Sequence, residues 1–220
     1  MPSALSLWMW WLMPVPDLLL ASNNHGKLRE LQAMLPAALN VVTLAELGID
    51  SPEETGATIA ENSALKAVLG ARASGVLTIA DDSGLEVDAL GGRPGVVSAR
   101  YAGPQASDND NIERLLADLA SVADPEPAAR FVCVLTLATA DGVLMSTRGE
   151  LAGRIIRQPR GVNGFGYDPI VELSDGRTVA ELSIEEKGAI SHRSKALREM
   201  RPALFIAVAS QRFSRQGDGQ

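Results

Sequence analysis

The chain has 220 residues, of which 46% are hydrophobic and 21% charged, a composition typical of a soluble globular protein. The length allows one large domain or two closely associated lobes. The net charge of −7 argues against binding to the nucleic-acid backbone, although local basic residues can still hold a small anion in a cleft. The single cysteine, Cys133, excludes an internal disulfide and a multi-cysteine metal site, and it fits a reducing, cytoplasmic setting.

The first sixteen residues differ from the rest of the chain. Residues 5–13 are apolar and include all three tryptophans, and no Lys or Arg precedes Lys27. This run lacks the basic start of a secretory signal and is too short to span a bilayer. We therefore expect residues 1–16 to be an extension outside the core, with Met13 as an alternative start and no membrane partner. Residues 17–212 are then a single two-lobed domain, followed by a flexible tail over 213–220.

Strands and helices alternate in the first half of the chain. The apolar patterns predict buried strands over 17–21, 41–44 and 76–80, a helix with Leu28, Leu31 and Leu35 on one face, and a second helix over 58–73. Two further strand-like segments, 86–90 and 96–99, are separated by a glycine-rich loop.

The second half of the chain combines helices with a hairpin. Ser107 or Asp108 is expected to cap a helix that runs to about residue 121 and divides the two lobes. Asp141-Gly142 is the expected turn between strands over 130–139 and 143–150. The chain is helical from Ile184, with a break near Pro202. This mixture predicts an α/β or α+β protein with a mixed sheet, of which we adopt α/β.

Asp81 and Asp82 follow the apolar run 76–80, so we expect them at the carboxyl end of a buried strand. Ligands of open α/β sheets bind at such ends, and paired carboxylates there need Mg²⁺ or a basic partner. Asp-Asp-Ser-Gly is also good turn chemistry, and from these residues alone a turn is an equal alternative.

The segment from Ser22 to Lys27 joins a strand to a helix, where backbone N–H groups and one lysine can bind an anion. It does not match a Walker A loop, because Ala21 stands where the first glycine is needed and Leu28 follows the lysine. The structural alternative is a helix that is capped by Asn24, with Lys27 in solvent.

Acidic residues also precede the second helix. Glu53 and Glu54 suit a helix N-terminus in any protein, but together with Asp81 and Asp82 they can hold a hard cation. Lys66, further along this helix, either faces the same cleft or lies in solvent.

Two polar clusters lie in the last third of the chain. Residues 164–169 (GFGYDP) either stack a flat base or form a tight turn with core aromatics. Lys187, His192 and Arg193 supply hydrogen-bond donors near a helix start. We find no Ser–His–Asp or Cys–His pattern, so hydrolysis through a covalent intermediate is not expected.

In this order, five segments of the chain resemble the inosine/xanthosine triphosphate pyrophosphatase family. They begin at Ser22, Glu53, Ala80, Gly164 and Glu185, and read SNNHGKLRE, EETGATIAENSALKA, ADDSGLEVDALGGRPGVVSARYAG, GFGYDP and EEKGAISHR. The resemblance covers residues 17 to about 200. Each motif is weak or moderate by itself, but the ordered set is highly specific.

The resemblance implies an elongated mixed β-sheet in two lobes flanked by helices, with the active-site cleft between the lobes. It also implies a homodimer and a dependence on Mg²⁺. The implied reaction hydrolyses the non-standard purine nucleotides ITP, dITP and XTP to the monophosphate and pyrophosphate.

The resemblance further implies roles for single residues. Asp82 would be the catalytic base and a metal ligand, Glu54 the other metal carboxylate, and Asp81 a further candidate ligand. The residues that would bind the phosphates are Ser22, Asn23, Asn24, His25, Gly26, Lys27 and Lys66. Those that would bind the nucleoside are Ser83, Phe165, Gly166, Tyr167, Asp168, Lys187, His192 and Arg193.

Physical chemistry agrees with this assignment, because water attack on a phosphoryl group needs positioning, charge neutralisation and a base. Donors such as those of Arg193, aimed at a 6-oxo group, would meet the amino group of adenine donor to donor. Other hypotheses are a pyrophosphatase for modified pyrimidine or methylated nucleotides, and a nucleotide-binding sensor without turnover. A phosphatase with an Asp nucleophile would need an acid where Gly84 stands.

Overall fold

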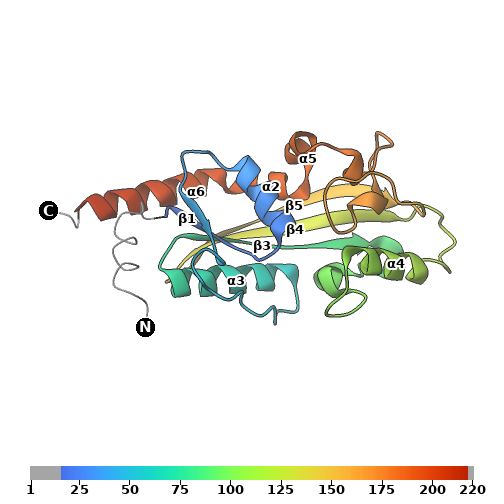
Figure 1. Ribbon diagram of the computed structural model, residues 1–220, viewed down its shortest axis with the longest axis horizontal. Helices are drawn as coiled ribbons and strands as arrows, with labels where there is room; N and C mark the ends of the chain where they lie inside the picture. Colours follow the sequence, from blue (N-terminus) through green and yellow to red (C-terminus); the bar gives the residue numbers. More distant parts are fainter. Residues whose placement is uncertain (1–15, 218–220) are drawn as a thin grey trace.

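The structure is a computed structural model that describes residues 16–217. Figure 1 shows an elongated molecule in which one long sheet is flanked by helices on both faces. The strand order is β2-β1-β3-β4-β5-β6, with β1 parallel to β2 and β3 and all other neighbours antiparallel. The predicted α/β mixed sheet is therefore confirmed. Apart from Pro16, the predicted N-terminal extension lies outside the described residues, as do the last three residues of the predicted tail.

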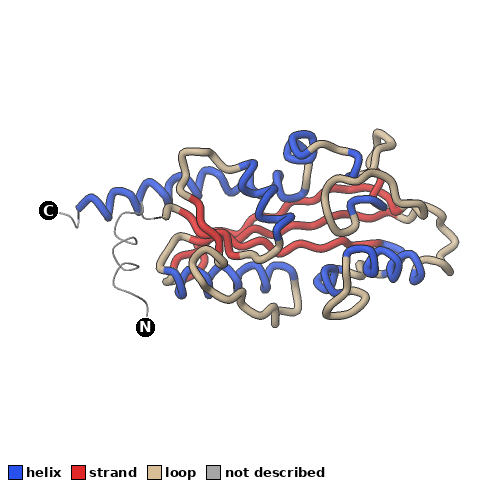
Figure 2. The backbone as a smooth tube through the Cα atoms, viewed as in Figure 1, coloured by secondary structure: helices blue, strands red, loops and turns tan. Residues whose placement is uncertain are grey.

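Figure 2 separates the strands, helices and loops along the chain. The strands are β1 (Leu18–Ala21), β2 (Val41–Thr43), β3 (Thr78–Val87), β4 (Ala128–Thr139), β5 (Gly142–Ile155) and β6 (Val171–Glu172). The α-helices are α2 (His25–Met34), α3 (Ile59–Ser74), α4 (Asp108–Asp118), α5 (Ile184–Ile190) and α6 (His192–Gly217). Short 3₁₀ turns are η1 (Asp88–Leu90), η2 (Gly95–Arg100), η3 (Asp168–Ile170) and η4 (Val179–Glu181).

Side-chain caps fix where the helices begin. Asn24 accepts a hydrogen bond from the backbone N of Lys27 at 3.0 Å, which confirms the predicted start of α2. Ser107 caps α4 in a capping box with Asp110, and Thr58 caps α3 in the same way with Glu61. These local signals are readable in the sequence because each cap lies within three residues of its partner.

The three larger apolar clusters of the described residues divide the molecule into two lobes. In lobe 1, at the left of Figure 1, β1 packs α2 and α6 on one face of the sheet and α3 on the other. In lobe 2, the distal halves of β3, β4 and β5 pack against α4, β6 and the segment around η3 and η4. Helix α4 therefore belongs to the core of lobe 2, and the expectation that it divides the lobes is wrong.

Strand β3 is longer than the sequence pattern predicted. It continues through Asp81 and Asp82 to Val87, so these carboxylates lie in the middle of the strand and not at its end. The expected turn is absent there because β4 pairs with β3 along its whole length, from Thr78 to Val87. Only β1 stops at this level, where Ala21 pairs with Ala80.

Two other predicted elements also differ from the structure. The strand-like segment 96–99 forms the 3₁₀ turn η2, in which Ser98 Oγ bonds to the carbonyl of Gly95 and accepts from the N–H of Leu85. The segment 86–90 is strand only as far as Val87, after which η1 begins.

The predicted break at Pro202 is wrong. Helix α6 begins at His192, with only Ser191 between it and α5, and it continues through Pro202. Proline removes one backbone donor, but Pro202 lies on the exposed side of α6, where water can replace the missing bond.

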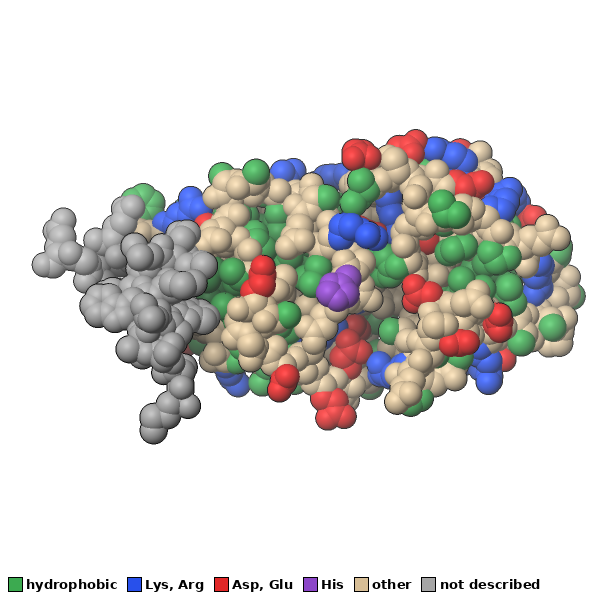
Figure 3. All heavy atoms as spheres, in the orientation of Figure 1, with side chains coloured by type: hydrophobic (Ala, Val, Ile, Leu, Met, Phe, Trp, Pro, Cys, Tyr) green, Lys and Arg blue, Asp and Glu red, His purple; other side chains and the backbone are tan. Residues whose placement is uncertain are grey.

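None of the described helices is long and apolar enough to cross a membrane. On the face shown in Figure 3, basic and acidic side chains are interspersed among apolar ones over both lobes.

Candidate active site

The candidate site forms where β1 leaves the sheet. After Ala21 the chain turns into α2, and the edge of β3 that β1 had covered becomes open from Asp81 onward. Successive residues of a strand point to opposite faces, so the opened edge exposes both faces of β3 to one cleft. Residues of both lobes line this cleft, which has a volume of about 250 Å³.

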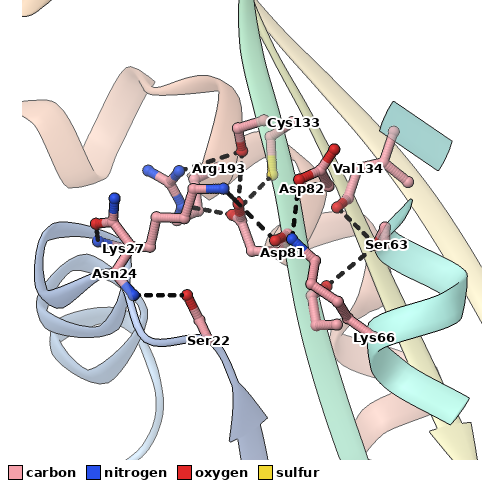
Figure 4. Close-up of polar contacts among 12 residues, drawn as sticks. Ser22, Asn24, Lys27, Ser63, Lys66, Asp81, Asp82, Cys133, Val134 and Arg193 are labelled. Atoms are coloured by element: carbon pink, nitrogen blue, oxygen red, sulfur yellow. Dashed lines mark hydrogen bonds and ion pairs between the residues drawn. The ribbon is translucent and has the colours of Figure 1, made fainter. Parts of the chain in front are cut away.

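One face of β3 directs Asp82 toward α3, as Figure 4 shows. Lys66 Nζ of α3 lies 2.9 Å from Asp82 Oδ1 and 2.7 Å from Glu54 Oε1, so two carboxylates converge on one ammonium group. Arg100, at the end of η2, reaches Glu54 Oε2 at 3.1 Å. The prediction that Lys66 lies in solvent is wrong, and the prediction that it faces the cleft is confirmed.

The two carboxylates of this group have opposite pKa shifts. Burial raises the pKa of Asp82, and the opposing charges of Lys66 and Lys27 do not cancel that effect. Burial would also raise the pKa of Glu54, but the charge and hydrogen bond of Lys66 outweigh it and lower the pKa to about 2. Asp82 is therefore the better proton acceptor, and Glu54 stays ionised.

Asp81 points to the other face of β3, toward α2 and α6 (Figure 4). Its carboxylate is fully buried and contacts Lys27 Nζ at 2.7 Å, Arg193 Nε at 2.7 Å and Ser83 Oγ at 2.6 Å. Burial opposes ionisation, but Arg193 and Lys27 hold the pKa of Asp81 well below its usual range. Asp81 thus anchors basic side chains beneath the cleft and does not line it.

A chain of buried ion pairs continues from Arg193. Glu30 of α2 accepts from Arg193 Nη1 and lies 2.7 Å from Lys187 Nζ, and Lys187 in turn lies 2.5 Å from Asp168. All four side chains are buried. Burial raises the pKa of Asp168 in spite of the charge of Lys187. This network fixes Lys187 and Arg193 at the end of the cleft where Phe165 lies.

Aromatic rings complete that end. Lys187 Nζ lies 4.9 Å from the centre of the Phe165 ring, and this ring packs directly on the backbone of Gly26. His192 stacks on Phe131, with ring centres 5.1 Å apart and an angle of 15° between the planes. Burial lowers the pKa of His192 well below its usual range, so the ring is neutral. The flat surfaces suit a flat ligand.

The structure gathers most of the predicted site residues in one place. Those that line the cleft are Ser22, Asn23, Asn24, Lys27, Glu54, Lys66, Asp82, Ser83, Phe165, Gly166, Tyr167, Asp168, Lys187, His192 and Arg193. Gly26 lies just behind them under the ring of Phe165. His25 is exposed on α2 and does not line the cleft.

Sequence reasoning missed several residues of the site. Lobe 2 contributes Ser98 and Asn111, and Asp108 accepts a hydrogen bond from the backbone N of Gly166 at 2.7 Å, which ties the aromatic loop to α4. Glu30 holds both Lys187 and Arg193, but in the sequence it resembles an ordinary helix carboxylate. Only the motif around Ser98 gave a signal that could have found any of them.

The carboxylates beside Lys66 are candidate ligands for Mg²⁺. Within the described residues, no three His, Cys, Asp or Glu side chains converge on one point as a closed metal site. Glu54 and Asp82 do converge, since both contact the same atom of Lys66, and both offer hard oxygen ligands beside an open cleft. Mg²⁺ is usually bound by one or two carboxylates together with substrate phosphates, so these residues fit it.

Several known proteins are similar to this chain in sequence and in fold. A sequence model of the Ham1 family matches residues 18–203. The dITP/XTP pyrophosphatases of Yersinia pseudotuberculosis and Escherichia coli K12 are 50% and 48% identical, covering 85% and 84% of this chain and 97% and 96% of their own. A HAM1 protein structure from Coxiella burnetii has a TM-score of 0.78 and 40% identity, covering 87% of this chain and 99% of its own.

Proposed function

Because the chain belongs to the Ham1 family, we propose that it is a Mg²⁺-dependent pyrophosphatase that hydrolyses dITP, ITP and XTP to the monophosphate and pyrophosphate. The observation that carries the proposal is the convergence of Glu54 and Asp82 on Lys66 beside a cleft whose other end is lined by flat rings. The names of the curated relatives support the substrate class.

The phosphate end of the cleft would neutralise and orient the triphosphate. Lys27 and Lys66 supply fixed positive charge, and the N-terminus of α2 offers backbone donors behind Ser22. Mg²⁺ held by Glu54 and Asp82 would supply further charge neutralisation and make a bound water more acidic.

Asp82 would act as the general base. Its Oδ1 is bonded to Lys66, and among the described residues no donor reaches Oδ2, which would take the proton from the attacking water. The water oxygen forms the new bond to phosphorus, the α–β phosphoanhydride bond breaks, and pyrophosphate leaves with the bonding electrons. The raised pKa of Asp82 suits this role, because it brings the carboxylate nearer to the basicity that proton transfer needs.

The nucleoside end would select the base. An arginine has five N–H donors, and Arg193 uses its Nε for Asp81, one Nη1 donor for Glu30 and one Nη2 donor for Ser83. The other two donors have no partner among the described residues, and a 6-oxo purine would accept from them. The amino group of adenine would oppose them, so ATP would be a poor substrate.

The test is to incubate the protein with Mg²⁺ and a panel of ITP, dITP, XTP, ATP, GTP and modified pyrimidine triphosphates, and to identify the products by ³¹P NMR. We expect pyrophosphate and monophosphate from the first three and little from ATP. Orthophosphate with a diphosphate would contradict the cleavage position. Preference for the pyrimidines, or binding without products, would favour the alternative enzyme or the sensor.

Two further properties are part of the proposal. By the family resemblance we expect a homodimer, which light scattering tests. We also expect a cytoplasmic enzyme, as the single buried Cys133 suits a reducing compartment.

A further inference from the structure

A short loop carries Glu54 into the site, and one buried amide holds that loop. Asn62 lies on α3, one turn before Lys66, and its side chain is completely buried. Its Oδ1 accepts a hydrogen bond of 2.7 Å from the backbone N of Gly56, two residues after Glu54. The amide orientation is set by this bond, because a flipped Asn62 would place a donor against the N–H of Gly56.

Close packing makes this contact specific. A Cβ atom added at Gly56 would lie 2.7 Å from Asn62 Oδ1 and 2.7 Å from Glu61 Cβ. Glu61 accepts from the backbone N of Ala57 at 2.7 Å, so the next residue is tied to α3 as well. These contacts therefore fix the loop in one position on α3, and Glu54 reaches Lys66 from that position.

The same amide is poorly suited to a purely stabilising role. Among the described residues, Asn62 Nδ2 has no hydrogen-bond partner although it is buried. A buried donor without a partner is destabilising, so an apolar residue of similar size would relieve that cost. What an apolar residue cannot do is accept from Gly56 and fix the loop that bears Glu54.

We propose that Asn62 is a positioning residue, which holds Glu54 at the Lys66–Asp82 pair through the backbone of Gly56 and so sets the affinity of the site for Mg²⁺. The part of this inference that concerns Mg²⁺ affinity rests on the proposed function. The part that concerns the position of the loop rests on geometry alone. Among the described residues, Asn62 makes no hydrogen bond to Glu54 or to Asp82.

The experiment compares Asn62→Leu, which removes the acceptor at similar volume, with Asn62→Asp, which keeps an acceptor at the same place. Thr78→Val is the matched control, because Thr78 is also fully buried and its hydroxyl bonds only to the carbonyl of Val76, away from the cleft. Gly56→Ala disturbs the same contact from the loop side and leaves Asn62 intact.

Two quantities are measured on each variant. The first is amide hydrogen exchange of Gly56 without Mg²⁺, which we expect to quicken at least tenfold in Asn62→Leu and to stay slow in Asn62→Asp and Thr78→Val. The second is the Mg²⁺ concentration for half-maximal ITP hydrolysis. Loss of a residue that supports a metal ligand typically costs 10- to 100-fold in metal affinity, and we expect about tenfold or more for Asn62→Leu and Gly56→Ala.

The outcomes separate this proposal from the proposed function. An unchanged Mg²⁺ half-saturation in both Asn62→Leu and Gly56→Ala would overturn it, as would equal effects of Asn62→Leu and Thr78→Val. If Asn62→Leu does not fold, Gly56→Ala decides by the same criteria. If the unmodified protein does not hydrolyse ITP, the proposed function fails. The amide hydrogen exchange of Gly56 still shows whether Asn62 holds the loop on α3.

Discussion

The guanidinium of Arg193, which lines the cleft, donates through Nε to Oδ2 of Asp81 beneath it, at 2.7 Å. Asp81 is fully buried and Arg193 is almost fully buried, and they come from the middle of β3 and from α6. Removing one partner of such a buried pair leaves an uncompensated charge, which costs about 3–5 kcal/mol. Arg193 therefore contributes to the fold as well as to the proposed base pocket.

Arg193→Ala is expected to lower both selectivity and stability. Loss of a charge-assisted hydrogen bond to the 6-oxo group is worth roughly 1.5–3 kcal/mol, or about ten- to more than a hundredfold in kcat/KM for ITP. ATP does not make this contact, so the ITP to ATP ratio of kcat/KM should shrink. Measuring both substrates on the folded fraction, determined by urea unfolding, separates the two effects.

Lys27→Ala is the control for that assignment. Lys27 also pairs with Asp81 but lies at the phosphate end, which all triphosphates share. Lys27→Ala should lower kcat/KM for ITP and for ATP by a similar factor. If Arg193→Ala likewise depresses both substrates equally, Arg193 does not read the base.

His192 gives the protein an acid-sensitive stability. Its pKa is well below its usual range because burial disfavours the charged ring, whereas the unfolded chain titrates near pH 6.5. The contribution of neutral His192 to the free energy of unfolding is complete above about pH 6.5. It is lost as the pH falls toward the lowered pKa of the folded state, at about 1.4 kcal/mol per pH unit.

His192→Phe keeps a ring to stack on Phe131 and should remove this loss. Urea unfolding at pH 7 and pH 5 should show a smaller drop in the free energy of unfolding for the variant than for the unmodified chain, by up to about 2 kcal/mol. His25→Gln, at an exposed position of α2, is the control. Equal drops in all three proteins would mean that His192 is protonated in the folded state.

The sequence predicted elements whose signals are local. The cap of α2 at Asn24 and the hairpin between β4 and β5 depend on neighbours within three residues. Both were predicted, although Ala140 and Asp141 form the turn and Gly142 already belongs to β5. The segment 96–99 failed because Val96 and Val97 are typical of strands, whereas the bonds of Ser98 to Gly95 and Leu85 decide the conformation.

The sequence predicted most of the residues that form the site, but not the contacts between them. Asp81 and Asp82 look alike in the sequence, yet β3 sends them to opposite faces and only Asp82 faces Lys66. That distinction depends on Arg193, which lies 112 residues further along the chain. No local pattern reports such a contact, nor the bond between Asn62 and Gly56, which depends on the packing of a loop on α3.

Asp82→Asn tests the proposed base. The amide keeps the shape and can still bond to Lys66, but it cannot take a proton from water. General-base catalysis contributes typically about 10²–10⁴-fold, so turnover of ITP should fall at least 100-fold while the melting temperature is retained. Retention of more than about a tenth of the activity would show that Asp82 is not the base.

Gly26→Ala tests whether the ring of Phe165 must lie on α2 for the base to bind. The new Cβ would lie 2.4 Å from Cδ1 of Phe165, so the ring has to leave its present position. Stacking of a base on an aromatic ring is worth about 1–3 kcal/mol, and kcat/KM for ITP should therefore fall about fivefold to a hundredfold, chiefly through KM.

Stability should move in the opposite direction in that variant. Alanine favours a helix over glycine by about 1 kcal/mol, and Gly26 lies within the first turn of α2. Gly188→Ala in α5 is the matched control, because its Cβ would meet only Met34 Cγ, at an ordinary 3.9 Å. It should gain helix stability and keep the KM of the unmodified enzyme. If Gly26→Ala also keeps that KM, base binding does not require Phe165 where it packs on Gly26, and the nucleoside end of the cleft must hold the base through its polar groups alone.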